Sequence, residues 1–376
     1  MCKMTKGWYG MTDILKINVG PQHPSTHGVL RLITELDGEN IISIEPVIGY
    51  LHRGLEKMAE SRTYLQYLPL VDRVDYLGGF FTSYAYCDAV EHLANIQVSK
   101  RAQYIRVLCM EMNRLASHLL WLGTYMLDLG ASSPLFYCFR DREVILSLFE
   151  ELTGQRMMYN YFTFGGVRFE VTNKWLDKIL TFIAQMPKNI DDYEKIITGN
   201  PIFKERTIKK GILHKQTAIK YAITGPNLRA SGVNLDLRKS HGYAIYSELD
   251  FVPAISHRSD SYGRYEVRIQ EMRTCLSLIR QCVLWLKANE GNSVSDIKPF
   301  NFKVSEGEYT SYVESSRGLL NCYIKSDGSE KPYRVKWRTG SFYAVQVLPE
   351  LLKEQQLCDI MAVFGSLDVI VPEVDR

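Results

Sequence analysis

Residues 100–127 read KRAQYIRVLCMEMNRLASHLLWLGTYML, and apolar side chains recur along them every three or four positions. The series is Ile105, Leu108, Met112, Leu115, Leu119, Leu122 and Met126. This spacing puts one long apolar stripe on a single helix face, which a helix buries by packing in a bundle. A second series has the same spacing: Tyr265, Ile269, Met272, Leu276, Ile279, Val283 and Leu286. The sequence therefore predicts two long bundle helices.

Shorter elements are predicted around these two helices. Strands are expected at 13–19, 29–36, about 41–45, 321–325 and 333–338, with Asp37-Gly38 as a hairpin turn. Further helices are expected at 52–67, 72–94, 134–153, 173–198 with an interruption at Pro187, and 349–362. Residues 200–260 are expected to be irregular, and 289–311 to form a polar surface connection.

The predicted class is α+β, with a small N-terminal antiparallel sheet and a mainly helical bundle core. Three parts are expected: residues 1–50 with the sheet, 51–290 with the helical core, and 291–376 as an α+β part packed on that core. No clean boundary separates them in the sequence, so they are expected to form one structural unit.

Composition excludes several classes of function. The net charge is +3, and no basic stripe with interleaved aromatics predicts nucleic-acid binding. No run approaches the roughly 20 apolar residues that span a bilayer. The eight cysteines include no C-x-x-C pair, which argues against a structural zinc site or an iron–sulfur cluster held by this chain. Buried, reduced thiols are expected instead.

A loop rich in proline and glycine links the first two predicted strands. It reads Gly20-Pro-Gln-His-Pro-Ser-Thr-His-Gly28, a composition that shapes the backbone and holds two histidine rings. The alternative is a passive turn whose histidines face water. Asp128 follows residues 100–127, at the helix end where the dipole disfavours a carboxylate. It is either buried against a donor or an exposed end residue.

Six motifs occur in order along the chain: 20–28, Gly49-Tyr-Leu-His-Arg-Gly-Leu-Glu56, Asp72-Arg-Val-Asp-Tyr-Leu77, Arg114-Leu-Ala-Ser-His118, Leu127-Asp-Leu-Gly-Ala131, and Ser366-Leu-Asp with the terminal Val374-Asp-Arg376. Together they resemble the quinone-site core subunit (49-kDa or D type) of respiratory complex I and its photosynthetic and archaeal relatives. The resemblance runs from about residue 13 to the last residue. It implies a fold like that of nickel–iron hydrogenase large subunits.

Those hydrogenases hold their metal with two C-x-x-C pairs, which would fall here at Asp75 and Gly78 and at Ile370 and Glu373. None of these residues is cysteine, and a nickel–iron centre requires soft thiolates. The hydrogenase reaction is therefore excluded, no metal site is expected on this chain, and the cavity is left to an organic head group.

The resemblance implies that a quinone head group binds between this chain and a small iron–sulfur subunit. That partner carries the terminal [4Fe–4S] cluster, and this chain binds no cofactor of its own. His27 and Tyr76 are implied as quinone ligands and proton donors, with Asp128 as the carboxylate that hydrogen-bonds His27. Imidazole and phenol can both donate protons to a reduced quinone.

Arg53 and Arg73, with His52 beside them, are implied to face the partner's cluster. His23 is expected to be structural. Without the resemblance, Tyr76 would be assigned to packing or the surface, and both arginines to the surface or to ion pairs.

The implied function is a core subunit of a proton-translocating quinone oxidoreductase, with NADH, reduced ferredoxin or coenzyme F420 as donor. A 30-kDa-type peripheral subunit and a membrane-arm subunit at the quinone entrance are further implied partners. The implied location is peripheral, on the cytoplasmic face of a bacterial inner membrane, with the mitochondrial matrix side and the thylakoid stromal side as alternatives. The competing function is a scaffold that has lost redox chemistry and only assembles partners. In the family, the 20–28 loop is also a candidate gate of the site.

This sequence departs from the family pattern at several positions. Met158 stands where many members have a histidine that makes cluster reduction pH-dependent, and a thioether does not titrate. Weak pH coupling and a low-potential quinone, menaquinone or plastoquinone rather than ubiquinone, are therefore expected. Gly340 and Val369 replace common prolines, and residues 289–313 are shorter than usual.

Overall fold

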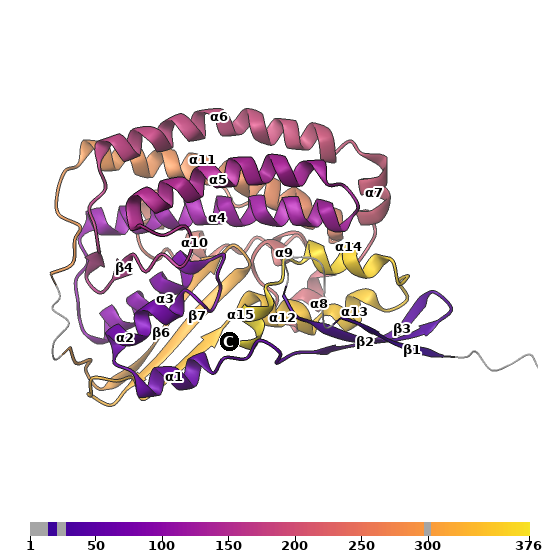
Figure 1. The fold of residues 1–376 in the computed structure, drawn as a ribbon, viewed down its shortest axis with the longest axis horizontal. Helices are drawn as coiled ribbons and strands as arrows, with labels where there is room; N and C mark the ends of the chain where they lie inside the picture. The colour runs from indigo at the N-terminus through magenta and orange to yellow at the C-terminus, as the bar shows by residue number, and fades with distance from the viewer. Residues whose placement is uncertain (1–13, 21–27, 297–301) are drawn as a thin grey trace, which may run out of the picture.

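The computed structural model describes residues 14–20, 28–296 and 302–376 (Figure 1). Long helices lie side by side on one side of the molecule, one three-stranded sheet lies on the other side, and a second such sheet projects at one end. The predicted α+β class, with an N-terminal antiparallel sheet and a mainly helical core, is confirmed. His23 and His27 lie outside the described residues.

The helical bundle contains α4 (Lys100–Asp128), α5 (Ser133–Thr153), α6 (Asn173–Ile197) and α11 (Ser261–Ala288). Helix α4 contacts both α5 and α11 and is buried along nearly its whole length, which confirms the stripe prediction. The predicted interruption at Pro187 is wrong, because α6 continues through it. Proline costs one backbone hydrogen bond there, and burial of the apolar face on both sides outweighs that loss. None of the described helices is both long and apolar enough to cross a membrane.

The N-terminal sheet contains β1 (Leu15–Val19), β2 (Arg31–Asp37) and β3 (Asn40–Val47), paired antiparallel in that order. Side chains of β2 alternate between the interior and the open face, as a sheet covered on one side requires. The edge of β3 pairs with the C-terminal part, since Ile41 N donates to Gln355 O at 2.8 Å. The predicted strands are therefore confirmed over the described residues, and the sheet is joined to the chain's other end.

Among the described residues, three helices precede α4: α1 (Leu55–Ser61), α2 (Tyr64–Val71) and α3 (Gly79–Leu93). The single helix predicted at 52–67 is wrong, because Thr63 and Gln66 form a capping box that starts α2. The helix predicted at 72–94 begins only at Gly79, after a turn. This turn carries Asp75 and Tyr76 and is where the site is built.

The second sheet contains β6 (Gly307–Ser315), β7 (Gly318–Ser326) and β8 (Arg334–Arg338). The strands predicted at 321–325 and 333–338 are confirmed. Residues 307–311 of β6, however, fall in the predicted surface connection, and no strand is predicted at 312–315. Its polar residues concealed it: Ser311 is fully buried and donates to Ala85 O of α3 at 2.7 Å.

The C-terminal helices are α12 (Gly340–Gln346), α13 (Leu348–Leu352), α14 (Asp359–Ser366) and α15 (Val371–Asp375). The single helix predicted at 349–362 is wrong, because the segment between α13 and α14 pairs with β3 instead. The remaining elements are short: β4 (Phe162–Thr163), β5 (Gly166–Val167), α7 (Pro201–Thr207), α8 (Lys215–Lys220), α9 (Gly225–Arg229), α10 (Leu237–Ser240) and the 3-10 turn η1 (Tyr246–Glu248).

Candidate functional site

Tyr76 lies in the turn between α2 and α3, half-buried against a small apolar cluster. The cluster is formed by Leu77, Leu120 of α4 and Ile370, and Phe139 of α5 packs against the same cluster. Burial raises the pKa of the Tyr76 phenol; Arg317 opposes this shift and Asp75 adds to it. The phenol is therefore neutral at physiological pH, which is the form that donates a proton.

A buried ion pair involves Asp75, the residue that precedes Tyr76. Arg317, in the turn between β6 and β7, donates from Nη1 to Asp75 Oδ2 at 2.7 Å. Its guanidinium also reaches Ser316 Oγ at 3.0 Å and Ser117 Oγ at 3.2 Å. Burial alone would lower the pKa of this guanidinium, but the nearby carboxylates outweigh it and hold the pKa above its usual value.

Two more carboxylates face the same guanidinium. Arg317 Nε lies 3.8 Å from Asp368 Oδ1 and 3.9 Å from Glu373 Oε2. Glu373 accepts from Gly340 N at 3.1 Å and from Ser341 Oγ at 2.6 Å. Burial, and then the charge of Asp75, raises the pKa of Glu373 to about 7. We call Asp75, Arg317, Asp368 and Glu373 the carboxyl cluster.

The carboxyl cluster joins the two segments that would carry metal-binding cysteines in a hydrogenase. Asp75 and Glu373 lie near opposite ends of the sequence, yet both face Arg317. At Gly78, an added Cβ would lie 2.3 Å from Asp75 Oδ2, so this arrangement leaves no room for a side chain there. Within the described ranges, no group of three His, Cys, Asp or Glu side chains is placed to hold a metal ion.

The predicted basic residues His52, Arg53 and Arg73 are brought together at the chain's C-terminal helix. Arg53 Nη2 donates to Arg73 O at 2.6 Å, and His52 Nδ1 lies 2.7 Å from Asp375 O. The Asp375 carboxylate in turn accepts from the backbone N–H groups of residues 49 and 51. Burial and the charge of Arg73 lower the pKa of Arg53, against the opposing attraction of Asp375. This basic edge is therefore fixed by backbone contacts and carries closely spaced positive charge.

Arg73 and Met158 line the same recess, of about 460 Å³. Met158 has a left-handed backbone conformation (φ 57°). Behind the recess, Asp72 accepts from Asn160 N at 2.8 Å and from the Ser83 hydroxyl, which fixes the Met158 segment against α3. Arg73, which is predicted to face the partner's cluster, and Met158, which differs from the family pattern, therefore lie on one surface.

Asp128 is the last residue of α4 and is half-buried. Its Oδ2 lies 3.8 Å from the position that a Cβ on Gly365 of α14 would take. It follows Leu120 by eight residues, or about 12 Å along the helix axis. The structure therefore places Asp128 beyond the apolar cluster of Tyr76, and its predicted partner His27 is outside the described residues.

Two motifs without an assigned chemistry form a buried ionic network in the core. From residues 114–118, His118 Nε2 lies 2.9 Å from Glu271 Oε2, while Arg114 donates to backbone carbonyls of β6. From residues 229–238, Arg229 pairs with Glu271 and Glu314. The sequence did not predict this network, because its members are brought together only by the fold.

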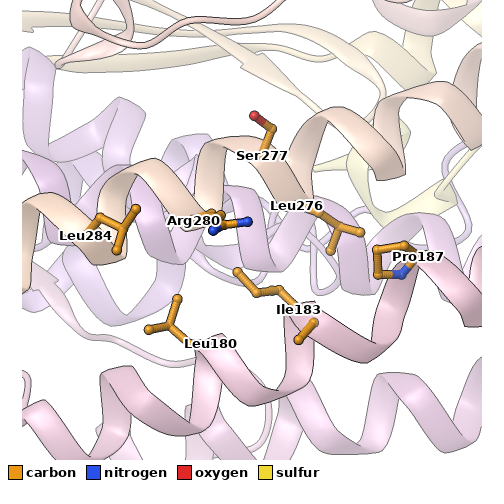
Figure 2. A pocket seen from close by; sticks show the side chains of 8 residues that line it. Leu180, Ile183, Pro187, Leu276, Ser277, Arg280 and Leu284 are labelled. Atoms are coloured by element: carbon orange, nitrogen blue, oxygen red, sulfur yellow. The ribbon is translucent and has the colours of Figure 1, made fainter.

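An apolar recess of about 500 Å³ lies elsewhere, between α6 and α11 (Figure 2). It is lined by Leu180, Ile183, Ala184, Pro187, Leu276, Ser277, Arg280 and Leu284. No predicted site residue is among them, and we assign this recess no part in the site.

Comparison with known proteins identifies the family of the chain. A family model described as "Respiratory-chain NADH dehydrogenase, 49 Kd subunit" matches residues 128–301 and 292–376. The chain is 45% identical to the D-type NADH-quinone oxidoreductase subunit of Geobacillus thermodenitrificans over 364 residues, which cover 97% of this chain and 99% of that protein. It is 48% identical to an H-type NAD(P)H-quinone oxidoreductase subunit of Gloeobacter violaceus over 381 residues, covering 96% and 97%. The chloroplastic H-type subunit of Chlorokybus atmophyticus is 46% identical over 389 residues, covering 97% and 98%. The chain belongs to the family of the 49-kDa, or D-type, subunit of the respiratory-chain NADH dehydrogenase.

Proposed function

We propose that this chain is the quinone-site core subunit of a complex I-type quinone oxidoreductase, with Tyr76 at the head-group end of the site. The observation that carries the proposal is a half-buried phenol with apolar side chains beside it and a buried carboxyl cluster behind it. The apolar side chains suit a quinone ring, and the phenol suits a quinone oxygen that becomes basic on reduction. The names of the relatives, NADH- and NAD(P)H-quinone oxidoreductase, support the same substrate class.

Reduction of a quinone to a quinol takes two electrons and two protons. In this proposal the electrons arrive from the terminal [4Fe–4S] cluster of a small iron–sulfur subunit, and this chain supplies the protons. Tyr76 donates one proton to a quinone oxygen, and His27, oriented by Asp128, donates the other. Loss of the His27 proton leaves the Asp128 charge uncompensated, which we propose as a first step of coupling to proton translocation.

The basic edge formed by His52, Arg53 and Arg73 faces the iron–sulfur partner in this proposal. Positive charge close to a buried cluster stabilises its reduced, more negative form. A 30-kDa-type peripheral subunit and a membrane-arm subunit at the quinone entrance complete the proposed set of partners. They would hold the chain at a membrane surface, for which we propose the cytoplasmic face of a bacterial inner membrane.

Phe139→Ala tests the apolar part of the site. Phe139 packs against the apolar cluster beside Tyr76, and its removal should raise the KM for quinone about tenfold, since about 1.4 kcal/mol of apolar contact corresponds to that factor. Steady-state kinetics of the assembled complex would measure it. Phe136→Ala is the matched control, because Phe136 is on the same helix but 70% exposed. Equal KM values for the two variants would contradict the proposed position of the quinone.

Met158→His tests whether the recess faces the partner's cluster. The left-handed conformation at residue 158 is one that histidine tolerates better than most residues, so the variant should fold. Near pH 6.5 the cluster's midpoint potential should become pH-dependent, with a slope of up to about 59 mV per pH unit. Redox titration of the complex by electron paramagnetic resonance would measure it. Leu284→His, in the recess between α6 and α11, should leave the potential unchanged, and a flat titration of Met158→His would contradict the assignment.

A further inference from the structure

The carboxyl cluster contains more negative charge than its arginines balance. Asp75, Asp368 and Glu373 are all buried. The guanidiniums within 4 Å of them are Arg317 and Arg268, whose Nε lies 3.9 Å from Asp368 Oδ2. Arg338 of β8 attracts Glu373 from farther away. With every group ionised, three negative charges face two positive ones. An uncompensated charge in a protein interior is costly, and binding one proton removes it.

The contacts show which carboxyl group takes that proton most readily. Asp75 is paired directly with Arg317 at 2.7 Å, whereas Glu373 has only neutral donors in hydrogen-bond range, Gly340 N and Ser341 Oγ. The guanidinium is 3.9 Å from Glu373, beyond hydrogen-bond distance. Asp368 Oδ2 is a further buried acceptor that has no hydrogen-bond partner among the described residues. Asp368 faces two guanidiniums, Arg317 at 3.8 Å and Arg268 at 3.9 Å, whereas Glu373 faces only Arg317, at 3.9 Å. Glu373 is therefore the least compensated member of the cluster.

The nearest charges that act on Glu373 come from three elements and agree with this assignment. Asp75 of the α2–α3 turn and Asp368 of the α14–α15 segment raise its pKa, and Arg317 of the β6–β7 turn lowers it. On α12, the Ser341 hydroxyl also lowers it. Burial is the largest influence, and the resulting pKa of about 7 keeps Glu373 partly protonated at neutral pH. Arg268 of α11 reaches the cluster through Asp368.

Gly340 contributes to the contacts of Glu373, and it stands where the resembling family commonly has a proline. Its backbone N–H donates to Glu373 at 3.1 Å, and an added Cβ would lie 2.4 Å from Arg317 O. A proline at this position, as is common in the family that the sequence resembles, has no N–H to donate. The glycine therefore both supplies a donor to Glu373 and allows α12 to approach the turn that carries Arg317.

We propose that the carboxyl cluster stores one exchangeable proton at Glu373 and returns it to Tyr76 after Tyr76 has protonated the quinone. This inference rests on the proposed function. The Tyr76 O–H bond breaks as the reduced quinone oxygen gains a proton. The Glu373 O–H bond then breaks as the phenol O–H re-forms, and the Glu373 carboxylate finally takes up one proton from the solvent. Electrons come only from the iron–sulfur partner. Tyr76 follows Asp75 in the chain and is in electrostatic contact with Asp75, Asp368 and Arg317.

Glu373→Gln in the assembled complex tests this proposal. The amide can keep both hydrogen bonds, accepting from Gly340 N and donating to Ser341 Oγ, so the fold should be retained. Redox-induced infrared difference spectra should lose a protonated-carboxyl C=O band. Quinone reduction should slow about tenfold, less than the 10²- to 10⁴-fold effect of a direct proton donor, with KM unchanged. In the unaltered complex the rate should fall as the pH rises through about 7, and this inflection should be absent from the variant.

Two further variants make the result decisive. Glu350→Gln, an exposed carboxyl on the adjacent α13, should keep the band, the rate and the pH profile. Glu373→Asp, which still titrates, should recover part of the rate. The proposal is overturned if the carboxyl band and the pH inflection persist in Glu373→Gln. If Tyr76→Phe is defective in that case, only the proton store is wrong; if Tyr76→Phe turns over normally, the proposed function itself fails.

Discussion

Tyr76→Phe in the assembled complex is expected to slow quinone reduction by about 10²- to 10⁴-fold, the range lost with a proton-donating side chain. Phenylalanine keeps the ring against Leu77, Leu120 and Ile370 and removes only the hydroxyl. The apolar contact with the quinone is therefore retained, and KM should change far less than kcat. The terminal cluster should still be reduced by the electron donor, because in the proposed function its electrons arrive through partner subunits.

Two measurements distinguish slower quinone reduction in Tyr76→Phe from a general defect of the complex. Electron paramagnetic resonance of the reduced complex would show the terminal cluster, and steady-state assays with a physiological quinone would give kcat and KM. Tyr333→Phe, at a position that is 61% exposed, is a matched control and should have normal kinetics. Turnover of Tyr76→Phe near that of the unaltered complex would contradict the role of Tyr76 and favour the competing function, a scaffold without redox chemistry.

The long elements could be predicted from the sequence because their signal is local and repeated. The stripe of residues 105–126 extends over about six turns, and the structure forms α4 within one residue of the predicted ends. The breaks between shorter elements were harder to see. Thr63 and Gln66 are a readable capping signal that the apolar pattern of 52–67 concealed. At Pro187 the opposite happened, since a strong local signal was outweighed by the packing on both sides.

The carboxyl cluster could not be assembled from the sequence, because its members come from separate parts of the chain. Asp75 and Glu373 were identified only as replacements of cysteines in a resembling family, and Arg317 and Asp368 were given no role. Arg317 lies in a two-residue connection between strands, where an arginine is ordinarily exposed, yet it is 2% exposed. Asp368 has a left-handed backbone conformation (φ 56°), which no sequence pattern predicts. Pairing of β6 with β7 and the path of the chain after α14 bring these charges together.

Arg317→Met is expected to destabilise the subunit by about 3–5 kcal/mol, the cost of removing one partner from a buried ion pair. The variant keeps most of the side-chain volume but leaves Asp75, Asp368 and Glu373 facing one another, with only Arg268 near Asp368. Arg334→Met is the matched control, because its pair with Glu60 is exposed and should contribute less than about 1 kcal/mol. Yield of the assembled complex and the midpoint of its thermal inactivation would measure the difference.

The loss of stability in Arg317→Met should depend on pH, and the carboxyl groups set the direction of this dependence. Removing the guanidinium raises the pKa values of Asp75 and Glu373 in the folded state further above their unfolded values. A carboxyl group with a raised pKa destabilises the fold once it must ionise, and this penalty disappears below its unfolded pKa. The stability deficit of Arg317→Met relative to Arg334→Met should therefore be largest above pH 7, the region of the Glu373 pKa. It should shrink as the pH falls towards 4.5, the ordinary pKa of a glutamate carboxyl group. A deficit that is independent of pH would show that Arg317 acts through packing and its serine contacts, and that the three carboxyl groups do not depend on it for their charge.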